Sequence, residues 1–219
     1  MNRLLITAGP THEAIDEVRY VANRSSGRMG IALAEAARDA GWSVTLLLGP
    51  VGVDPPTGVT VEDYVSTADL EALLDREFLK CDVLIMAAAV ADYRPSTAAK
   101  GKLARKGENL VLTLEPTPDL VARCAARRKP HQRIIGFALE EESTLETRAT
   151  EKLQRKNLDA LVANPISTLE AKNVSASVYF PDGRRISPSL SDSGERGVEK
   201  SAFAKWLMDL VNAEFPLST

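Results

Sequence analysis

The chain has 219 residues and a formal net charge of −3, with 27 Lys and Arg residues against 30 Asp and Glu residues. This balance offers no basic surplus, so a nucleic-acid partner is not expected. No apolar run approaches the roughly 18 residues of a membrane-spanning helix, and the N-terminus lacks a signal-peptide pattern. Cys81 and Cys124 lie far apart in apolar or helical surroundings, which is typical of reduced core thiols. We therefore expect a cytoplasmic protein without membrane partners.

Strand patterns alternate with helix patterns through most of the chain. The expected strands are residues 4–6, 42–48, 59–65, 82–90, 110–115, 134–140 and 160–163, and the expected helices are residues 26–40, 67–80, 118–128 and about 145–156. Several of the strands are almost continuously apolar, as strands buried on both faces are. The alternation predicts an α/β fold with a three-layer, Rossmann-like, mostly parallel sheet.

The C-terminal part has a different character. Residues 177–187 predict a β-hairpin around the turn Asp182-Gly183, residues 187–197 form a Ser/Gly-rich connector, and residues 198–213 predict an amphipathic helix. We expect residues 1–219 to form a single domain, with a small β appendage at about 174–190 and a C-terminal helix.

Residues 4–30 predict an anion site. An apolar strand breaks at Gly9, a polar loop follows, and Asn23, Ser25, Gly27 and Gly30 lead into a helix. The first N–H groups of a helix lack partners, the helix dipole favours negative charge there, and glycine lets a phosphate approach the backbone closely. The spacing differs from the dinucleotide fingerprint, and no Walker A sequence is present.

Other candidate residues follow the ends of predicted strands. In an open parallel sheet, ligands bind beyond the carboxyl ends of the strands, so residues at these ends can meet. These residues are Gly9, Met86, Ala87, Ala88, Asp92, Gly136 and Phe137. Gly9-Pro10 could equally form a simple turn, and the alanines could serve close packing alone.

Lysines and one asparagine complete the candidates. Lys102 lies in a glycine-flanked basic loop, residues 94–109, that could close over a site and neutralise a phosphoryl group, or could be a solvated face. Lys152 and Lys156 share a helix face and could grip a triphosphate, or could be surface lysines. Asn23 could hold an oxyanion or cap the helix. His12 and His131 build no zinc site or catalytic triad.

Several motifs together resemble one family. They are ITAGPT, VRYVANRSSGRMG, AAAVADYRP, PTPDLV, GFALE and KNLDALVAN, which occur in this order across residues 4–211. They resemble phosphopantothenoylcysteine synthetase, the second half of the bacterial bifunctional coenzyme A biosynthesis flavoprotein (the DFP family).

The resemblance implies a ligase that joins 4′-phosphopantothenate to L-cysteine. The substrate carboxylate would react with a nucleoside triphosphate to give an acyl-nucleotide (acyl-CMP where CTP is used) and pyrophosphate, and the cysteine amine would then displace the nucleotide. Mg²⁺ and CTP, or less readily ATP, are implied as cofactor and co-substrate, and members of the family are homodimers. We expect the dimer contact on the β appendage.

The resemblance also implies residue roles. Asn23 matches the asparagine that handles the acyl-nucleotide, and Lys102 the loop lysine linked to its formation. Ser25, Gly27 and Gly30 match the phosphate turn. The implied nucleotide contacts are Met86, Ala87, Ala88, Asp92, Pro118, Asp119, Leu120, Val121, Phe137, Lys152 and Lys156.

The sequence departs from the family pattern at three places, one of which is a segment before Lys152 that is one residue longer than the pattern. The flavin-dependent decarboxylase half is absent, so we expect a stand-alone synthetase or an excised domain that binds no flavin, with a separate phosphopantothenoylcysteine decarboxylase as a partner. The family loop Lys-x-Lys-Lys reads Lys102-Leu103-Ala104-Arg105 here, and Lys100 could substitute. An atypical Rossmann oxidoreductase and a non-catalytic nucleotide-binding module stay as alternatives, although no Tyr-x-x-x-Lys pair is present at Tyr20 or Tyr93.

Overall fold

A central sheet of eight strands organises the fold in the computed structural model, which describes residues 2–105, 107–168, 173–189 and 197–216. Six strands are parallel, and two antiparallel strands extend one edge. In spatial order the strands are β13 (Arg185–Ile186), β12 (Ser177–Tyr179), β10 (Ala160–Pro165), β9 (Arg133–Glu140), β6 (Val83–Met86), β1 (Arg3–Ala8), β4 (Ser43–Leu48) and β5 (Thr60–Asp63). The expected mostly parallel α/β sheet is confirmed.

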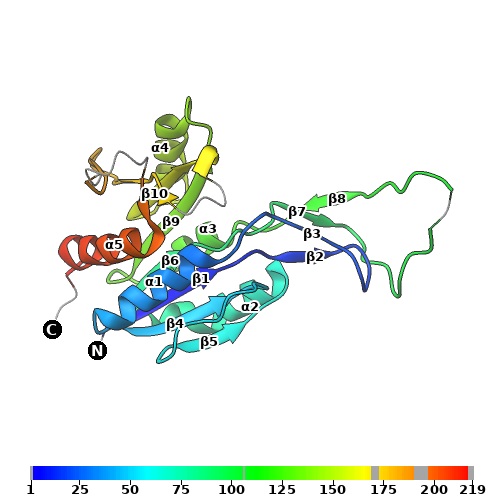
Figure 1. Ribbon diagram of the computed structural model, residues 1–219, viewed down its shortest axis with the longest axis horizontal. Helices are drawn as coiled ribbons and strands as arrows, with labels where there is room; N and C mark the ends of the chain where they lie inside the picture. The colour runs from blue at the N-terminus through cyan, green and yellow to red at the C-terminus, as the bar shows by residue number, and fades with distance from the viewer. Residues whose placement is uncertain (1, 106, 169–172, 190–196, 217–219) are drawn as a thin grey trace.

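Helices cover both faces of this sheet. They are α1 (Arg28–Asp39), α2 (Thr67–Glu77), α3 (Leu120–Ala126), α4 (Leu145–Arg155) and α5 (Lys200–Glu214), with short 3₁₀ turns η1 (Phe78–Lys80) and η2 (Ile166–Thr168). Helices α1 and α5 pack on one face, and α2, α3 and α4 on the other (Figure 1). The three-layer arrangement and the C-terminal helix are therefore confirmed.

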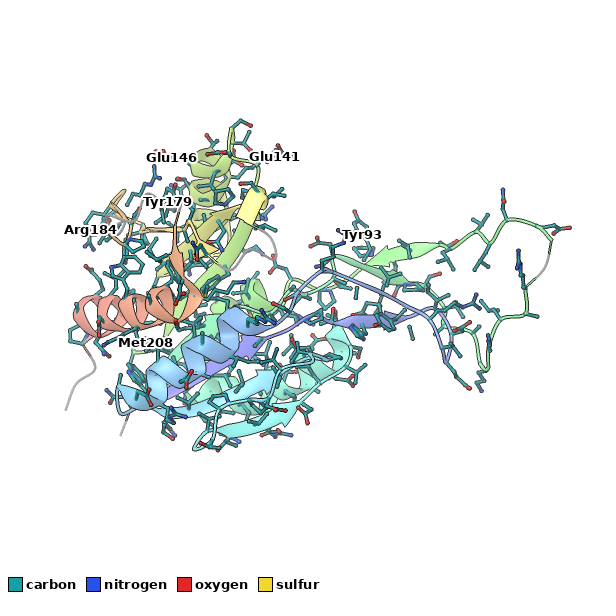
Figure 2. The ribbon with its side chains drawn as sticks, viewed as in Figure 1. Tyr93, Glu141, Glu146, Tyr179, Arg184 and Met208 are labelled. Atoms are coloured by element: carbon teal, nitrogen blue, oxygen red, sulfur yellow. The ribbon has the colours of Figure 1, made fainter. Side chains whose placement is uncertain are left out.

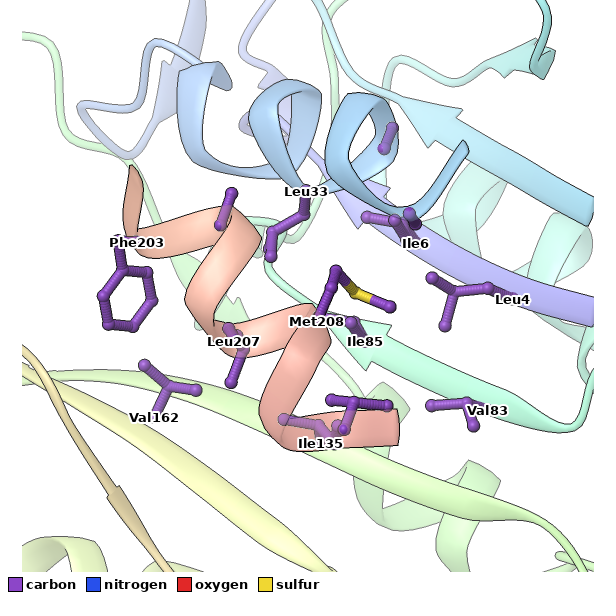
Figure 3. Packing of buried hydrophobic residues seen from close by; sticks show 14 of the residues in the cluster. Leu4, Ile6, Leu33, Val83, Ile85, Ile135, Val162, Phe203, Leu207 and Met208 are labelled. Atoms are coloured by element: carbon purple, nitrogen blue, oxygen red, sulfur yellow. The ribbon is translucent and has the colours of Figure 1, made fainter. Parts of the chain in front are cut away.

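The two apolar cores follow from the two-residue period of the strands. On β1, Leu4 and Ile6 face the α1/α5 side, whereas Leu5 faces the other core. Figure 3 shows Leu207 and Met208 of α5 beside the strands that carry Leu4, Ile6, Val83 and Ile85. The C-terminal helix is therefore part of the main core.

An arm projects from the carboxyl side of the sheet. It consists of two antiparallel pairs, β2 (His12–Ala14) with β3 (Tyr20–Ala22) and β7 (Tyr93–Pro95) with β8 (Leu114–Pro116). The loop between β7 and β8 extends furthest from the helices (Figure 1). On the arm, His12 belongs to β2 and stacks on Tyr20, with ring centroids 3.7 Å apart.

Two predicted sheet strands differ in the structure. The strand expected over 82–90 ends at Met86, because the next backbone N–H groups bond to the end of β1 and to threonine side chains. The strand expected over 110–115 is instead β8, which pairs with β7 in the arm. An apolar run indicates a strand, but it carries no information about which strand it pairs with.

Boundaries at three other elements also shift. Helix α3 begins after Asp119, whose carboxylate accepts from the Ala122 N–H at 3.2 Å, so Pro118 lies outside the expected first turn. Helix α1 begins at Arg28 rather than residue 26, because Gly27 adopts a left-handed φ of 69°. Residues Val198–Glu199 form β14, which pairs with β11 (Asn173–Val174), so α5 begins at Lys200.

The predicted hairpin around Asp182-Gly183 is present as β12 and β13. It extends the edge of the central sheet beside β10 instead of forming a separate appendage. Arg184 ties the hairpin to α5 by a bidentate contact with Glu214, at 2.8 Å for each nitrogen–oxygen pair. Leu190 and most of the expected connector (residues 190–196) lie outside the described residues, as does Lys106 of the basic loop.

A close approach between α1 and β1 predicts the effect of one substitution. A Cβ on Gly30 would lie 2.3 Å from the Ala8 Cβ, so Gly30→Ala forces the helix away from the strand. We expect a loss of about 1–3 kcal/mol in the free energy of unfolding, measured by urea denaturation. Gly52→Ala is the control, because nothing lies within 4 Å of its added Cβ. A loss of equal size in both variants would contradict this account.

Candidate functional site

A cavity of about 720 Å³ opens at the carboxyl ends of β6 and β9 and beside the first turn of α1. This is the size of a pocket for a nucleotide-sized ligand. The predicted residues that line it are Asn23, Ser25, Gly27, Gly30, Met86, Ala87, Ala88, Asp92, Pro118, Asp119, Leu120, Val121, Gly136, Phe137, Lys152 and Lys156. Gly9 and Lys102 are the predicted residues that do not line it.

Glycines bring the backbone of the α1 turn close to the end of β1. A Cβ on Gly27 would lie 2.7 Å from Val51 Cγ1 and 3.5 Å from Gly9 Cα. Gly9, with φ of 86°, therefore lies behind the phosphate turn and supports it instead of lining the cavity. The N-terminal amides of α1 are left at the cavity wall, which suits an anionic group.

Asn23 has a defined orientation. Its Nδ2 donates to the Val90 carbonyl at 2.9 Å and lies 3.5 Å from the Ala89 carbonyl. Carbonyl oxygens accept and do not donate, so this contact assigns the nitrogen of the amide to the loop. The Oδ1 atom is then the part of the exposed side chain that a ligand can use. The alternative role of Asn23 as a helix cap is wrong, because Gly27 holds that position.

Small and apolar residues shape the other side of the cavity. Residues 87–90 are half-buried and present methyl groups, and Phe137 faces the same space. Gly136 lies beside it, and a Cβ there would lie 2.8 Å from Leu158 Cδ1, so the leucine side chain would have to shift. These surfaces fit a flat, weakly polar group such as a base.

The charged residues at the cavity are mainly basic. The described lining residues include the cations Arg24, Arg28, Lys152, Arg155, Lys156 and Lys200 but only the carboxylates Asp92 and Asp119. This local surplus contrasts with the net charge of −3 of the chain and favours a polyanionic ligand.

Carboxylates hold the two predicted helix lysines in place. Lys156 lies 3.0 Å from an Asp119 oxygen, and Lys152 lies 2.5 Å from Glu140. The Lys200 pKa is lowered by burial and by the nearby positive charge of Arg28. An anion bound here would relieve the repulsion between these two cations.

Sequence reasoning missed several lining residues. Arg24, Arg28 and Arg155 are adjacent in sequence to predicted site residues, and this adjacency could have indicated that they line the cavity. Lys200 comes from the start of α5 and reaches the cavity only through tertiary packing. Asn164, at the end of β10, has a buried Oδ1 without a hydrogen-bond partner in the described part of the chain. Its position at the end of a predicted apolar strand could have indicated that Asn164 lies at the cavity.

Lys102 lies on the arm, apart from Asn23. Its loop is tied to the β2–β3 turn, because the Leu103 N–H donates to Asp16 Oδ2 at 3.0 Å and Arg19 Nη2 donates to the Leu103 carbonyl at 3.0 Å. The Arg19 guanidinium holds the pKa of the buried Asp16 carboxyl far below its usual range. The structure thus separates the two residues that the resemblance implies are catalytic.

No metal cluster is apparent at this site. The described residues contain no group of three or more His, Cys, Asp or Glu side chains that could hold a metal ion. Asp119 already caps α3 and pairs with Lys156, so Asp92 is the carboxylate left at the cavity. A Mg²⁺ ion carried by a triphosphate needs few protein ligands, which this arrangement fits.

Two other predictions concern the class of protein. Cys81 and Cys124 are free and buried, as expected, and burial raises the pKa of Cys81 to about 12. Across the ranges that the structure describes, no helix has the length and apolar character needed to cross a bilayer.

These features define the class of protein: a Rossmann-like α/β domain whose strand ends and α1 turn form a cavity with mainly basic charged residues. Residues 1–212 match the family described as the DNA/pantothenate metabolism flavoprotein C-terminal domain, and the chain belongs to this family.

Curated proteins are similar to this chain over most of its length. The coenzyme A biosynthesis bifunctional protein CoaBC of Vibrio cholerae is 39% identical over 97% of this chain and 52% of its own length. A cysteine/cysteine sulfinic acid decarboxylase from an unknown prokaryotic organism is 46% identical over 75% of this chain and 46% of its own length. The chain therefore spans about half the length of these curated relatives.

Solved structures support the fold. The crystal structure of the C-terminal domain of CoaBC has a TM-score of 0.80 and 35% identity, covering 97% of this chain and 94% of that one. The DNA/pantothenate metabolism flavoprotein of Streptococcus pneumoniae has a TM-score of 0.82 at 24% identity, covering 97% and 99%. A Cab2 mutant in complex with phosphopantothenate-cysteine shares the fold, with a TM-score of 0.81 at 18% identity, covering 98% and 86%.

The charge pattern predicts an effect of Lys156→Met on anion binding. Removing the lysine deletes an attraction and leaves Asp119 uncompensated, so we expect tripolyphosphate to bind about tenfold more weakly, which corresponds to about 1.4 kcal/mol. Isothermal titration calorimetry at low salt measures this. Lys205→Met, an exposed lysine on α5, is the control, and equal weakening in both variants would exclude a local role.

Proposed function

We propose that this chain is a phosphopantothenate–cysteine ligase of coenzyme A biosynthesis. In the first step, a carboxylate oxygen of 4′-phosphopantothenate attacks the α-phosphorus of a nucleoside triphosphate, and the bond to pyrophosphate breaks. In the second step, the amine of L-cysteine attacks the acyl carbon, releases the nucleoside monophosphate and loses a proton. The observation that supports this most is the pocket, in a chain of this family, that combines an anion turn with the oriented amide of Asn23.

The pocket residues suit these two steps. The α1 turn, with Ser25, Gly27 and Gly30, would receive phosphate oxygens, and Lys152 and Lys156 would neutralise the triphosphate. The base and ribose would contact Met86, Ala87, Ala88, Asp92, Pro118, Asp119, Leu120, Val121 and Phe137. Of the two nucleotides, CTP is the proposed co-substrate, with ATP as the alternative.

Asn23 would act on the acyl-nucleotide. With Nδ2 engaged by Val90, Oδ1 can accept a hydrogen bond from the incoming cysteine amine and hold its lone pair toward the acyl carbon. This role belongs to the second step, so loss of Asn23 is expected to impair amide formation more than pyrophosphate release.

The proposed ligase reaction also implies which metal and cofactors the chain would use. A Mg²⁺ ion would neutralise charge on the triphosphate, and Asp92 is the carboxylate at the cavity that could bind it. No flavin is expected in this chain, and a separate phosphopantothenoylcysteine decarboxylase and a cytoplasmic location stay as predictions.

A homodimer would bring Lys102 to a pocket. The arm carries exposed apolar side chains, namely Val18, Tyr20, Tyr93, Leu110, Val111, Leu112 and Leu114 (Figure 2 labels Tyr93). A patch of this kind on a projecting element is typical of an interface. We therefore propose that the arm, rather than the hairpin first expected to form the contact, packs against a second copy and presents Lys102 to that copy's pocket.

Pyrophosphate release tests the reaction. Purified protein is incubated with 4′-phosphopantothenate, Mg²⁺ and either CTP or ATP, with and without cysteine. We expect release that requires phosphopantothenate and is faster with CTP, and amide product once cysteine is added. Absence of release with both nucleotides would refute the catalytic proposal and leave a nucleotide-binding module.

Lys102 and Lys100 form a matched pair of variants. Lys102→Met removes the proposed stabiliser of the phosphoryl transition state, so we expect pyrophosphate release to fall by about 100-fold or more. Lys100→Met, two residues away on the same exposed loop, is expected to retain activity within about threefold. The reverse result would transfer the role to Lys100.

Mixing two inactive variants tests whether Lys102 acts on a second copy. If each site takes Asn23 from one chain and Lys102 from the other, a mixed dimer of Lys102→Met with Asn23→Ala has one site in which both residues are intact. If each site takes both residues from one chain, neither site of the mixed dimer is intact. We therefore expect partial recovery of amide formation after co-refolding the two variants. If no recovery occurs although mixed dimers form, Lys102 acts within its own chain.

A further inference from the structure

The loop after β6, residues 87–91, is held by two buried threonines that do not line the cavity. Thr7 Oγ1 accepts from the Ala88 N–H at 3.1 Å, and Thr11 Oγ1 accepts from the Ala91 N–H at 3.0 Å. Both threonines are fully buried. Their hydroxyls thus replace backbone partners for the Ala88 and Ala91 N–H groups, whereas the Ala87 and Ala89 N–H groups still donate to the carbonyls of Thr7 and Gly9.

Thr11 is the better connected of the two. Its own N–H donates to the Ala89 carbonyl at 3.3 Å, so it contacts the loop on both sides of Val90. The carbonyls of Ala89 and Val90 are the groups that face the Asn23 amide. Thr11 therefore holds the loop at Ala89 and at Ala91, on either side of the Val90 carbonyl that accepts from the Asn23 amide.

A chain of hydrogen bonds anchors the Thr11 hydroxyl. Thr67 Oγ1 donates to the buried Glu13 carboxylate at 2.6 Å, and Thr67 Oγ1 lies 3.2 Å from Thr11 Oγ1. Thr67 Oγ1 is the donor toward both Glu13 and Thr11, and the two lone pairs of Thr11 Oγ1 let it accept from the Thr67 hydroxyl and from the Ala91 N–H together. Glu13 also accepts from the Thr67 N–H at 2.9 Å, so the chain ends on the first turn of α2.

We propose that Thr11 is a positioning residue: its hydroxyl, anchored through Thr67 to Glu13, sets the path of residues 89–91 and thereby the orientation of the Asn23 amide. This rests on the proposed function only for its kinetic consequence. The geometric part concerns the loop and Asn23 alone. The hydroxyl touches no part of the cavity surface, so Thr11 acts through Asn23 and not on the substrate.

Isosteric substitution tests the kinetic consequence. Thr11→Val removes the hydroxyl at almost constant volume, and we expect amide formation from the acyl-nucleotide to fall about 10- to 100-fold, the scale of a small misplacement of a reacting group. Pyrophosphate release and the KM for the nucleotide are expected to change much less. Thr11→Ser keeps the hydroxyl and is expected to restore amide formation to within about threefold of the parent.

Two further variants guard against a general loss of structure. Thr67→Val breaks the same chain one residue further from the loop and is expected to change the same step in the same direction, but less. Thr45→Val, on β4 outside this network, is the matched control and is expected to leave both steps unchanged. Equal losses in Thr11→Val and Thr45→Val, or a loss in Thr11→Val that affects both steps alike, would overturn the proposal.

The Asn23 side-chain amide gives a readout that does not need activity. In ¹⁵N-labelled protein, its NH₂ signals are assigned by their loss in Asn23→Ala. We expect these signals to shift in Thr11→Val and to stay in place in Thr11→Ser and Thr45→Val. If the parent chain proves inactive, the ligase proposal fails but this comparison still decides the positioning role. Unmoved Asn23 signals in a folded Thr11→Val would refute it.

Discussion

The close approach of the first turn of α1 to the end of β1 is the constraint on which the site depends. A Cβ on Gly30 would clash with Ala8, and a Cβ on Gly27 would clash with Val51 while only touching Gly9. This contact places the free amides of the helix at the carboxyl edge of the sheet, where the ends of β6 and β9 also arrive. The phosphate turn and the rest of the cavity wall are therefore consequences of one helix–strand contact.

Hydrogen bonds behind the cavity wall hold its backbone in place. Behind the wall, the Tyr64 hydroxyl donates to the Ala8 carbonyl at 2.8 Å, and Thr7 and Thr11 bond the backbone of the alanine loop. Nearly all these groups are buried, and a buried polar group that lost its partner would be costly. The short side chains at the cavity surface thus depend on a polar network that the ligand does not reach.

The arm is packed differently from the rest of the domain. It lacks a core of its own among the described residues and exposes apolar side chains such as Tyr93 and Val111. In the β2–β3 turn of the arm, the Asp16 carboxylate accepts hydrogen bonds from the Arg19 guanidinium and from the Leu103 N–H. A segment of this kind gains most by packing against another surface, and this is the reason that the loop lysine and the pocket asparagine are assigned to different copies in the proposed ligase.

The sequence by itself determined the layered α/β fold and most of the pocket. Apolar strand runs, helix patterns and the glycine turn are local signals, and parallel strands end at one edge, so Met86, Asp92 and Phe137 could be expected to meet. Only the tertiary structure decided the pairing of β8, the sheet position of the hairpin, the burial of Thr11 and the place of Lys102. Each of these depends on which distant segment a strand or loop contacts, and short apolar or polar runs do not encode their partners locally.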